Sequence, residues 1–211
     1  MRTVLNSIGS ILASRPGKES HSSVILRLMR RFLRSVPVVL AFWGAGIAAQ
    51  DKQPGNVAPY YPSPLPVVKQ MLELGELKAG QLHYDLGSGD GRLVIAAAKD
   101  FGARSVGFEI DQKLVDASRQ QIADLDLGSL ASIESRDLFE ADFSLPDLIT
   151  VYLLPKALER LRPLLEKQMK PGSVVISHDF TVAGWEPDQV VTIDEELEID
   201  GLLHSIYIYR R

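Results

Sequence analysis

A glycine-rich turn followed by a distant acid is the feature that most constrains the fold of this 211-residue chain. The turn lies within Tyr84-Asp85-Leu86-Gly87-Ser88-Gly89-Asp90-Gly91-Arg92, and an amphipathic segment follows it. A second apolar run begins at Ser105 and leads to Glu109, 24 residues after Asp85. A parallel α/β sheet builds a nucleoside pocket from a strand that enters a glycine turn and continues as a helix. We therefore expect an α/β sheet with such a pocket.

Apolar segments of strand length alternate with segments of helix length along the rest of the chain. The patterns predict strands at 82–86, 105–110, 131–136, 148–153 and 173–177, and helices at 64–74, 93–100, 112–125 and 156–169. Two final alternating segments, 190–193 and 205–209, predict an antiparallel pair. Strands separated by helices imply right-handed crossovers between parallel strands. The expected fold class is α/β, a doubly wound, mostly parallel sheet with an antiparallel C-terminal strand pair.

The spacing within the turn narrows the class of ligand. Gly87, Gly89 and Gly91 follow the pattern G-x-G-x-G, whereas pyrophosphate-binding turns follow G-x-G-x-x-G. Asp90 lies inside the turn, where its charge would repel a pyrophosphate and favour a ligand with a cationic group. Glu109 ends the second strand, where a carboxylate can accept hydrogen bonds from both hydroxyls of a ribose. The pattern therefore disfavours a dinucleotide oxidoreductase and favours a nucleoside with a cationic arm.

The segment Asp85–Arg92 resembles the first motif of class I S-adenosylmethionine (SAM)-dependent methyltransferases. The resemblance covers about residues 59–211, and it implies a Rossmann-like methyltransferase fold with SAM as the cofactor. It also implies that Glu109 binds the ribose and that Asp137, within Ser135–Phe139, contacts the adenine amino group. The turn residues implied to bind the cofactor are Asp85, Gly87, Ser88, Gly89, Asp90 and Gly91.

Within this class, the chain is similar to the seven-strand protein lysine methyltransferases. One branch is the Dot1-like domain, which has a D-L-G-S-G turn. Another comprises the mitochondrial enzymes that methylate the c subunit of ATP synthase and the adenine nucleotide translocase. These enzymes have a segment like Pro59–Pro64 before the fold and an N-terminal hydrophobic stretch. The resemblance implies methyl transfer to a lysine of a protein.

Two other functions remain open at this point, a small-molecule methyltransferase and a module that binds SAM or S-adenosylhomocysteine (SAH) without turnover. The fourth strand runs into Val151-Tyr152-Leu153-Leu154-Pro155. This segment lacks the N-P-P-aromatic motif of methyltransferases that act on adenine or on glutamine amides. The sequence therefore argues against those two acceptors.

Candidate catalytic and substrate-binding residues follow from the positions of the strand ends. Tyr60 and Tyr61 lie between prolines and can close over the cofactor, or they can pack the linker against the domain. Tyr152 follows the fourth strand, at the edge where open α/β sheets bind ligands. His178 and Asp179 follow the fifth strand at the same edge, where they can accept a proton from a lysine ammonium or anchor a loop.

Other polar residues are assigned smaller roles. We expect Arg92 to pair with an acid near the turn, and His83 and His204 to be strand residues without a special role. Asp85 can orient the cofactor or cap the following helix. The chain has no cysteine, and its four histidines show no metal-ligand spacing, so the sequence predicts no metal site.

The charge is distributed unevenly along the chain. Residues 1–50 hold seven of the 23 Lys/Arg and one of the 27 Asp/Glu, so residues 51–211 hold 16 basic and 26 acidic side chains. An acidic domain is a poor match for nucleic acid, which requires a basic surface. A basic protein or peptide, or a small molecule, suits it better.

The first part of the chain resembles a targeting segment. A basic cluster at Met29–Arg34 precedes an apolar run that ends in small residues, which is typical of a secretory signal. We expect a signal or membrane anchor over 1–49, a linker over 50–58 and the methyltransferase domain over 59–211. The apolar run is shorter than the roughly 20 residues of a comfortable membrane span, so cleavage and anchoring both remain open. The expected location is exported or membrane-anchored, through residues 30–49, with the cytoplasm as the alternative.

Overall fold

The computed structural model describes residues 60–193 and 202–211. The expected signal or anchor, the linker and Pro59 lie outside these residues, so the boundaries of the three segments and the membrane association of residues 30–49 stay predictions. Every helix in the described portion is too short or too polar to cross a bilayer.

Seven strands in the described residues form one sheet, in the order β3-β2-β1-β4-β5-β7-β6. The strands are β1 Leu82–Leu86, β2 Arg104–Glu109, β3 Ala131–Ser135, β4 Leu148–Val151, β5 Val174–His178, β6 Gln189–Ile193 and β7 His204–Arg210. The first five strands are parallel, β7 runs antiparallel to β5, and β6 runs antiparallel to β7. The predicted fold class is therefore confirmed.

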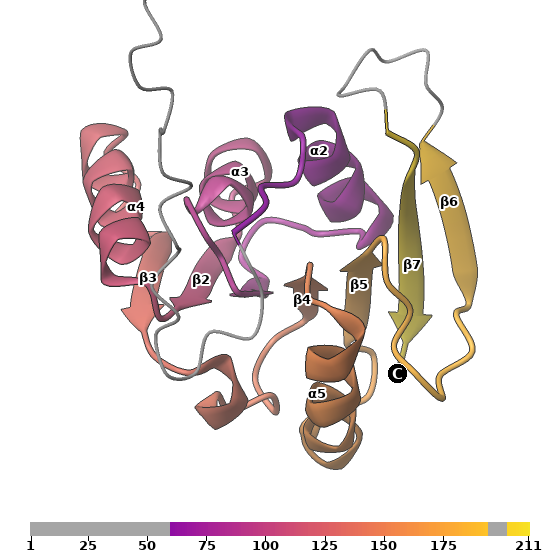
Figure 1. The fold of residues 1–211 in the computed structure, drawn as a ribbon. Coiled ribbons are helices and arrows are strands. Elements are labelled where there is room, and N and C mark those ends of the chain that lie inside the picture. Colours follow the sequence, from indigo (N-terminus) through magenta and orange to yellow (C-terminus); the bar gives the residue numbers. More distant parts are fainter. Residues whose placement is uncertain (1–59, 194–201) are drawn as a thin grey trace, which may run out of the picture. The chain divides into compact units, whose positions relative to one another are not determined.

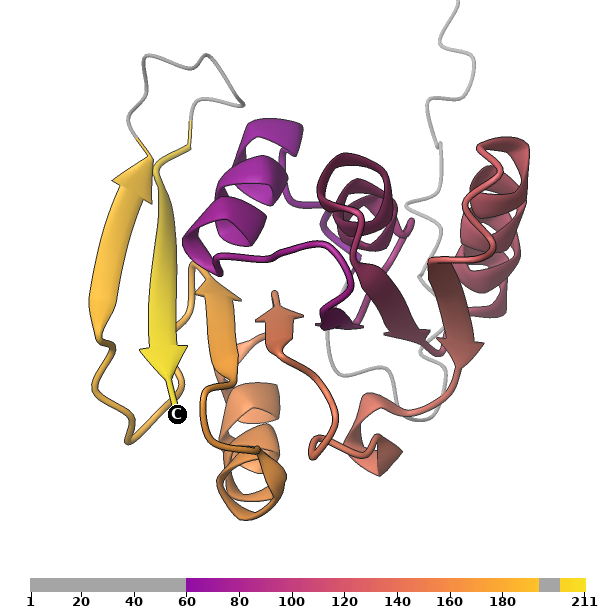
Figure 2. The same cartoon turned by 180° about the vertical axis from the view of Figure 1, so that it is seen from behind.

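Helices cover both faces of this sheet. They are α2 Leu65–Leu74, α3 Arg92–Phe101, α4 Gln112–Asp124, the short 3-10 helix η1 Leu138–Glu140, and α5 Pro155–Gln168. Figure 1 shows α2, α3 and α4 on one face and α5 on the other, and Figure 2 shows the same layers from behind. The predicted helices and strands are confirmed, with ends that shift by one or two residues, whereas η1 was not predicted.

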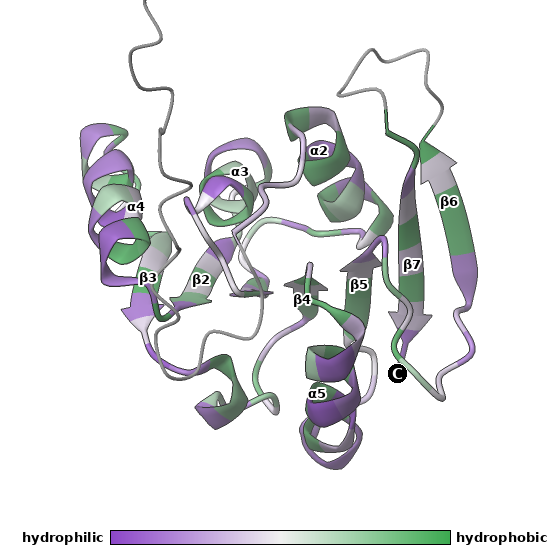
Figure 3. Ribbon diagram, viewed as in Figure 1, coloured by the Kyte–Doolittle hydropathy of each residue, from purple (hydrophilic) through white to green (hydrophobic). Residues whose placement is uncertain are grey.

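Apolar side chains fill both spaces between the sheet and the helices. On one face, Leu158, Leu161 and Leu165 of α5 belong to the core that contains β1 and β4. On the other, Val67 and Met71 of α2 belong to a cluster with β5 and β7. Figure 3 shows apolar stretches on the helices and strands of these layers. β4 is buried along its whole length because strands flank it on both sides.

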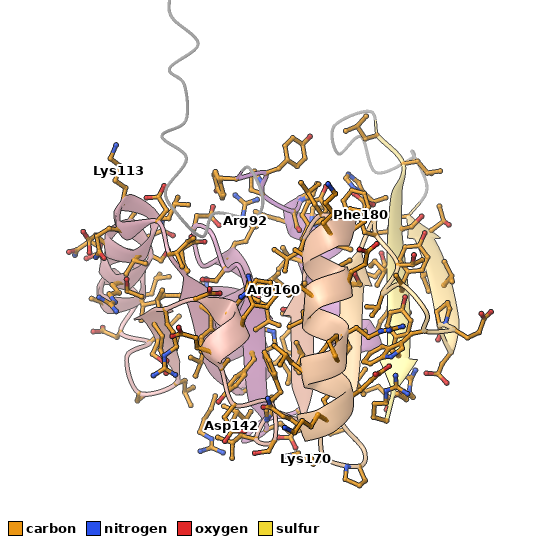
Figure 4. All side chains as sticks on the ribbon, turned by 60° about the horizontal axis from the view of Figure 1, so that its bottom comes forward. Arg92, Lys113, Asp142, Arg160, Lys170 and Phe180 are labelled. Atoms are coloured by element: carbon orange, nitrogen blue, oxygen red, sulfur yellow. The ribbon has the colours of Figure 1, made fainter. Side chains whose placement is uncertain are left out.

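This packing brings the carboxyl ends of the five parallel strands to one edge of the sheet. Arg92 and Phe180, which follow β1 and β5, lie toward that edge in Figure 4, whereas Asp142 and Lys170, which precede β4 and β5, lie at the opposite one. Open α/β sheets bind ligands beyond the carboxyl ends of their strands, where the strand order reverses. In this sheet the reversal lies between β1 and β4.

The glycine turn after β1 packs closely on β2. The amides of Gly87 and Ser88 both donate to the carbonyl oxygen of Phe108, each at 3.0 Å. Next to Phe108, a Cβ at Gly107 would lie 2.5 Å from the Ser88 Oγ and 2.7 Å from the Ile133 Cδ1. The absence of a side chain at Gly107 therefore allows the turn to lie directly on the strand.

We expect Gly107→Ala to lower the free energy of unfolding by about 1–3 kcal/mol, because the added methyl group overpacks this contact. Urea denaturation measures the change. The matched control is Gly128→Ala, since no atom lies within 4 Å of a Cβ at that position. Equal stabilities of the two variants would contradict the close packing.

Candidate active site

The turn between β1 and α3 uses three left-handed backbone conformations. Gly87, Gly89 and Gly91 have φ angles of 81°, 54° and 77°, which glycine adopts at little steric cost. A Cβ at Gly89 would lie only 2.7 Å from the Tyr60 Cε2. The ring of Tyr60 therefore lies against the turn, and Gly89 leaves room for it.

The Glu109 carboxylate holds the turn from the end of β2. Its Oε2 accepts from the Gly89 amide at 2.9 Å, and its Oε1 accepts from the amides of Ile110 at 2.8 Å and Asp111 at 2.9 Å. A carboxylate has about four acceptor positions, so capacity for a further donor remains. The arrangement fits a ribose hydroxyl, and the predicted ribose contact stays a prediction.

Asp90 and Arg92 form an ion pair at the start of α3. The Arg92 Nη2 lies 2.6 Å from the Asp90 Oδ2, and the Arg92 Nη1 donates to the Ser63 carbonyl at 2.7 Å. Burial by itself would raise the pKa of Asp90, but hydrogen bonds and charge from Arg92 outweigh it, so the pKa is lowered. The expected pairing of Arg92 with an acid near the turn is confirmed.

Asp85 lies beneath the turn in a chain of buried polar groups. The Thr150 hydroxyl donates to the Asp85 Oδ1 at 2.7 Å and lies 2.8 Å from the His83 Nε2. The His83 Nδ1 lies 2.7 Å from the hydroxyl of Ser105. Because Thr150 has one hydroxyl hydrogen and gives it to Asp85, the His83 Nε2 carries the hydrogen and Nδ1 accepts from Ser105.

Burial controls the ionisation of this chain. It raises the pKa of Asp85 to about 7, and it lowers the pKa of His83 to about 3. His83 is therefore neutral and supports Thr150 below the turn, although the sequence indicated no role for it. In the described residues no side chain caps α3, whose N-cap is Gly91, so the structure does not show the alternative role of Asp85 as a cap.

Asp137 follows β3 and begins η1. Its Oδ1 accepts from the Phe139 amide at 3.0 Å, which caps the short helix and fixes the carboxylate near the end of β3. The Arg160 guanidinium lies 3.7 Å from the centre of the Phe139 ring and supports the helix from α5. Contact between Asp137 and the adenine amino group stays a prediction.

Aromatic rings gather at the carboxyl ends of β4 and β5. The ring of Tyr152 lies 6.4 Å from that of Tyr61, 6.2 Å from that of Phe180 and 4.1 Å from the imidazole of His178. The Tyr152 hydroxyl donates to the Asp179 Oδ2 at 3.1 Å. The predicted residues Tyr61, Tyr152, His178 and Asp179 are thus brought together.

A buried histidine pair stands behind these rings. The His178 Nδ1 lies 2.8 Å from the Ser63 hydroxyl, and the His178 Nε2 lies 2.9 Å from the His204 Nδ1. Both histidines are at most 1% exposed, whereas the side chain of Asp179 is 22% exposed. No local pattern indicated a role for His204, because its position depends on β7 pairing with β5, which places Ile206 opposite His178.

The residues at the turn fit SAM. Glu109 offers a carboxylate to the ribose, and the three glycines place bare backbone beside it. Asp85 lies directly beneath the turn, and the Tyr60 ring bounds it on the side of Gly89. Glu109, Asp137 and the turn from Gly87 to Gly91 would hold the cofactor.

Comparisons with known proteins point in the same direction. Residues 85–189 match the ANTKMT methyltransferase domain. A protein-lysine N-methyltransferase of Saccharolobus islandicus (strain REY15A) is 38% identical over 152 residues, which cover 72% of this chain and 92% of that protein. The lysine N-methyltransferase of the ATP synthase C subunit from Homo sapiens is 31% identical over 132 residues, which cover 63% of this chain and 56% of that relative.

A solved structure gives a similar fold. It is described as an RNA methyltransferase from Salinibacter ruber in complex with SAH. Its sequence is 44% identical, its TM-score is 0.64, and the match covers 71% of this chain and 92% of that one. Together with the ANTKMT match, this SAH-bound structure identifies SAM as the cofactor.

We expect Glu109→Ala to weaken SAH binding by about 1.5–3 kcal/mol, because a charged acceptor for the ribose is lost and the Gly89 amide loses its partner. Isothermal titration calorimetry measures the affinity. Glu109→Gln keeps a neutral acceptor and should lose less. Glu134→Ala on β3 is the control, since the side chain of Glu134 is 44% exposed and pairs with Arg136. Unchanged affinity in Glu109→Ala would exclude the ribose contact.

The raised pKa of Asp85 predicts a pH dependence of stability without cofactor. Because the pKa rises from 3.8 in the unfolded chain to about 7, the folded chain holds the proton more tightly. This stabilising contribution is present below pH 3.8 and is lost as the pH rises through about 7.

Asp85→Asn should remove this contribution, so that its unfolding free energy falls less steeply than that of the unmodified protein between pH 4 and pH 7, by at most about 1.4 kcal/mol per pH unit. Urea denaturation across this range measures both slopes. Asp100→Asn, an exposed acid at the end of α3, controls for loss of a carboxylate. Parallel curves for Asp85→Asn and the unmodified protein would contradict a protonated Asp85.

Proposed function

This chain belongs to the protein-lysine N-methyltransferase family of SAM-dependent methyltransferases, and we propose that it methylates the side-chain amine of a lysine in a protein. The observation that carries the proposal is the group of aromatic rings and one carboxylate at the ends of β4 and β5. Tyr61, Tyr152 and Phe180 present ring surfaces beside the partly exposed Asp179. This surface has the chemistry that an alkylammonium acceptor requires.

SAM supplies an electrophilic methyl group on a sulfonium, and the attacking amine must be neutral. Asp179 carries a negative charge at the acceptor edge, where it can bind the lysine ammonium and help to receive its proton. Tyr152 fixes the Asp179 Oδ2 by its hydroxyl and offers a ring face to the methylated cation. His178 is fully buried, so we assign it a positioning role behind Tyr152 and Asp179.

Charge favours a protein acceptor over RNA, which is the acceptor class in the description of the Salinibacter ruber relative. Residues 51–211 carry 26 acidic and 16 basic side chains, which disfavours a polyanion. The same excess of acid favours a lysine within a basic protein or peptide segment. The acceptors in the names of the other relatives, the ATP synthase C subunit and the adenine nucleotide translocase, are also proteins.

Transfer of label from tritiated SAM to a cell extract tests the proposal. We expect a labelled band that survives ribonuclease, disappears with protease and yields methyl-lysine after acid hydrolysis. Label that ribonuclease removes would support an RNA acceptor instead. Label confined to small molecules, or SAH binding without any transfer, would also contradict the proposal.

Tyr152→Phe should lower kcat/KM for the protein acceptor about 10- to 100-fold, because the hydrogen bond that fixes the charged Asp179 is lost. SAH affinity should stay within about twofold, since Tyr152 lies outside the turn. Tyr207→Phe, in the middle of β7, is the matched control and should leave the rate unchanged. Loss of SAH binding equal to the loss of rate in Tyr152→Phe would contradict the assignment to the acceptor side.

A further inference from the structure

Three atoms of the types that ligate metals converge at the carboxyl end of β5. The His178 Nε2 and the His204 Nδ1 are 2.9 Å apart, and the Asp179 Oδ2 lies 3.4 Å from the first and 3.3 Å from the second. In a tetrahedral zinc site with bonds of about 2.0–2.1 Å, neighbouring ligand atoms are about 3.3–3.4 Å apart. The triangle therefore has nearly the dimensions of one face of such a site.

Hydrogen bonds within this triangle can join only part of it. Each neutral imidazole carries one hydrogen, and one hydrogen shared between His178 and His204 serves a single edge. The Asp179 Oδ2 receives a hydrogen from Tyr152, so it has none to offer to either ring. A cation at the centre would instead use a lone pair from all three atoms.

Neighbouring groups orient the three side chains as they do around bound metals. The Ser63 hydroxyl lies 2.8 Å from the His178 Nδ1, so that ring can carry its hydrogen on Nδ1 and present a lone pair at Nε2. The Ser205 amide donates to the Asp179 Oδ1 at 2.9 Å and leaves Oδ2 for the triangle.

The backbone of Asp179 is also held in an uncommon conformation. Its φ angle is 57°, in the left-handed region that favours glycine, and its amide donates to the Ser205 carbonyl at 2.7 Å. Such a conformation persists where the surroundings hold it, often at functional sites.

We propose that His178, Asp179 and His204 bind one divalent transition-metal ion, with Zn²⁺ as the best match to two imidazoles and one carboxylate. A water molecule or the Tyr152 hydroxyl completes four ligands. The sequence predicted no metal site because the third ligand lies 25 residues after Asp179 along the chain and meets it only through β7. The ion would join the end of β5 to the start of β7, and the site does not depend on which acceptor the enzyme methylates.

Calorimetric titration of the untagged full chain, stripped with a chelator, tests the proposal with Zn²⁺ as the probe. We expect one Zn²⁺ per chain, a rise in Tm on binding, and a visible tetrahedral spectrum when Co²⁺ replaces Zn²⁺. His204→Gln and Asp179→Asn should each weaken binding at least 100-fold. Ser63→Ala should weaken it about 10- to 100-fold, because it removes the group that orients His178.

Asp142→Asn is the matched control and should bind Zn²⁺ as the unmodified protein does, since this exposed acid lies at the opposite edge (Figure 4). SAH affinity in each variant reports whether the domain is folded. Absence of Zn²⁺ binding and of a Co²⁺ spectrum in the unmodified protein would overturn the proposal, and so would equal binding by folded His204→Gln. Because no methyl acceptor is present, neither result bears on the lysine assignment.

Discussion

The bond between the Gly89 amide and the Glu109 carboxylate is the contact on which the arrangement of the candidate site depends. It fixes a turn of three left-handed glycines to the end of β2, next to the bonds from Gly87 and Ser88 to Phe108. Since β2 lies between β1 and β3, the turn shares the rigidity of the sheet. The geometry of the cofactor side is thus set by the strands before any ligand binds.

The predictable parts of this structure are those encoded by local patterns. The glycine spacing and the alternation of apolar segments identified the turn, the parallel strands and the C-terminal pair. The polar chain beneath the turn was not predictable, because Thr150 meets Asp85 only when β4 pairs with β1. His204 was missed for the same reason, since β7 lies between β5 and β6 in the sheet although it follows both in the chain. Such contacts depend on register between distant strands, which no local pattern encodes.

The edge of the sheet divides into two groups of residues with different tasks. The turn, Glu109 and Asp137 follow β1, β2 and β3, whereas Tyr152, His178 and Asp179 follow β4 and β5. A relative named for protein lysine and one described as acting on RNA match 72% and 71% of this chain. Shared fold therefore does not specify the acceptor, and differences among such enzymes must be sought in the second group.

Ser63 touches both groups at once. Its carbonyl accepts from the Arg92 guanidinium next to the turn, and its hydroxyl contacts His178 beneath the acceptor side. Thermodynamic linkage is reciprocal, so any free energy by which a bound acceptor shifts this residue must reappear in the affinity for the cofactor, and the converse holds equally. One serine thus gives the two substrates of a transfer reaction a route by which each can sense that the other has arrived.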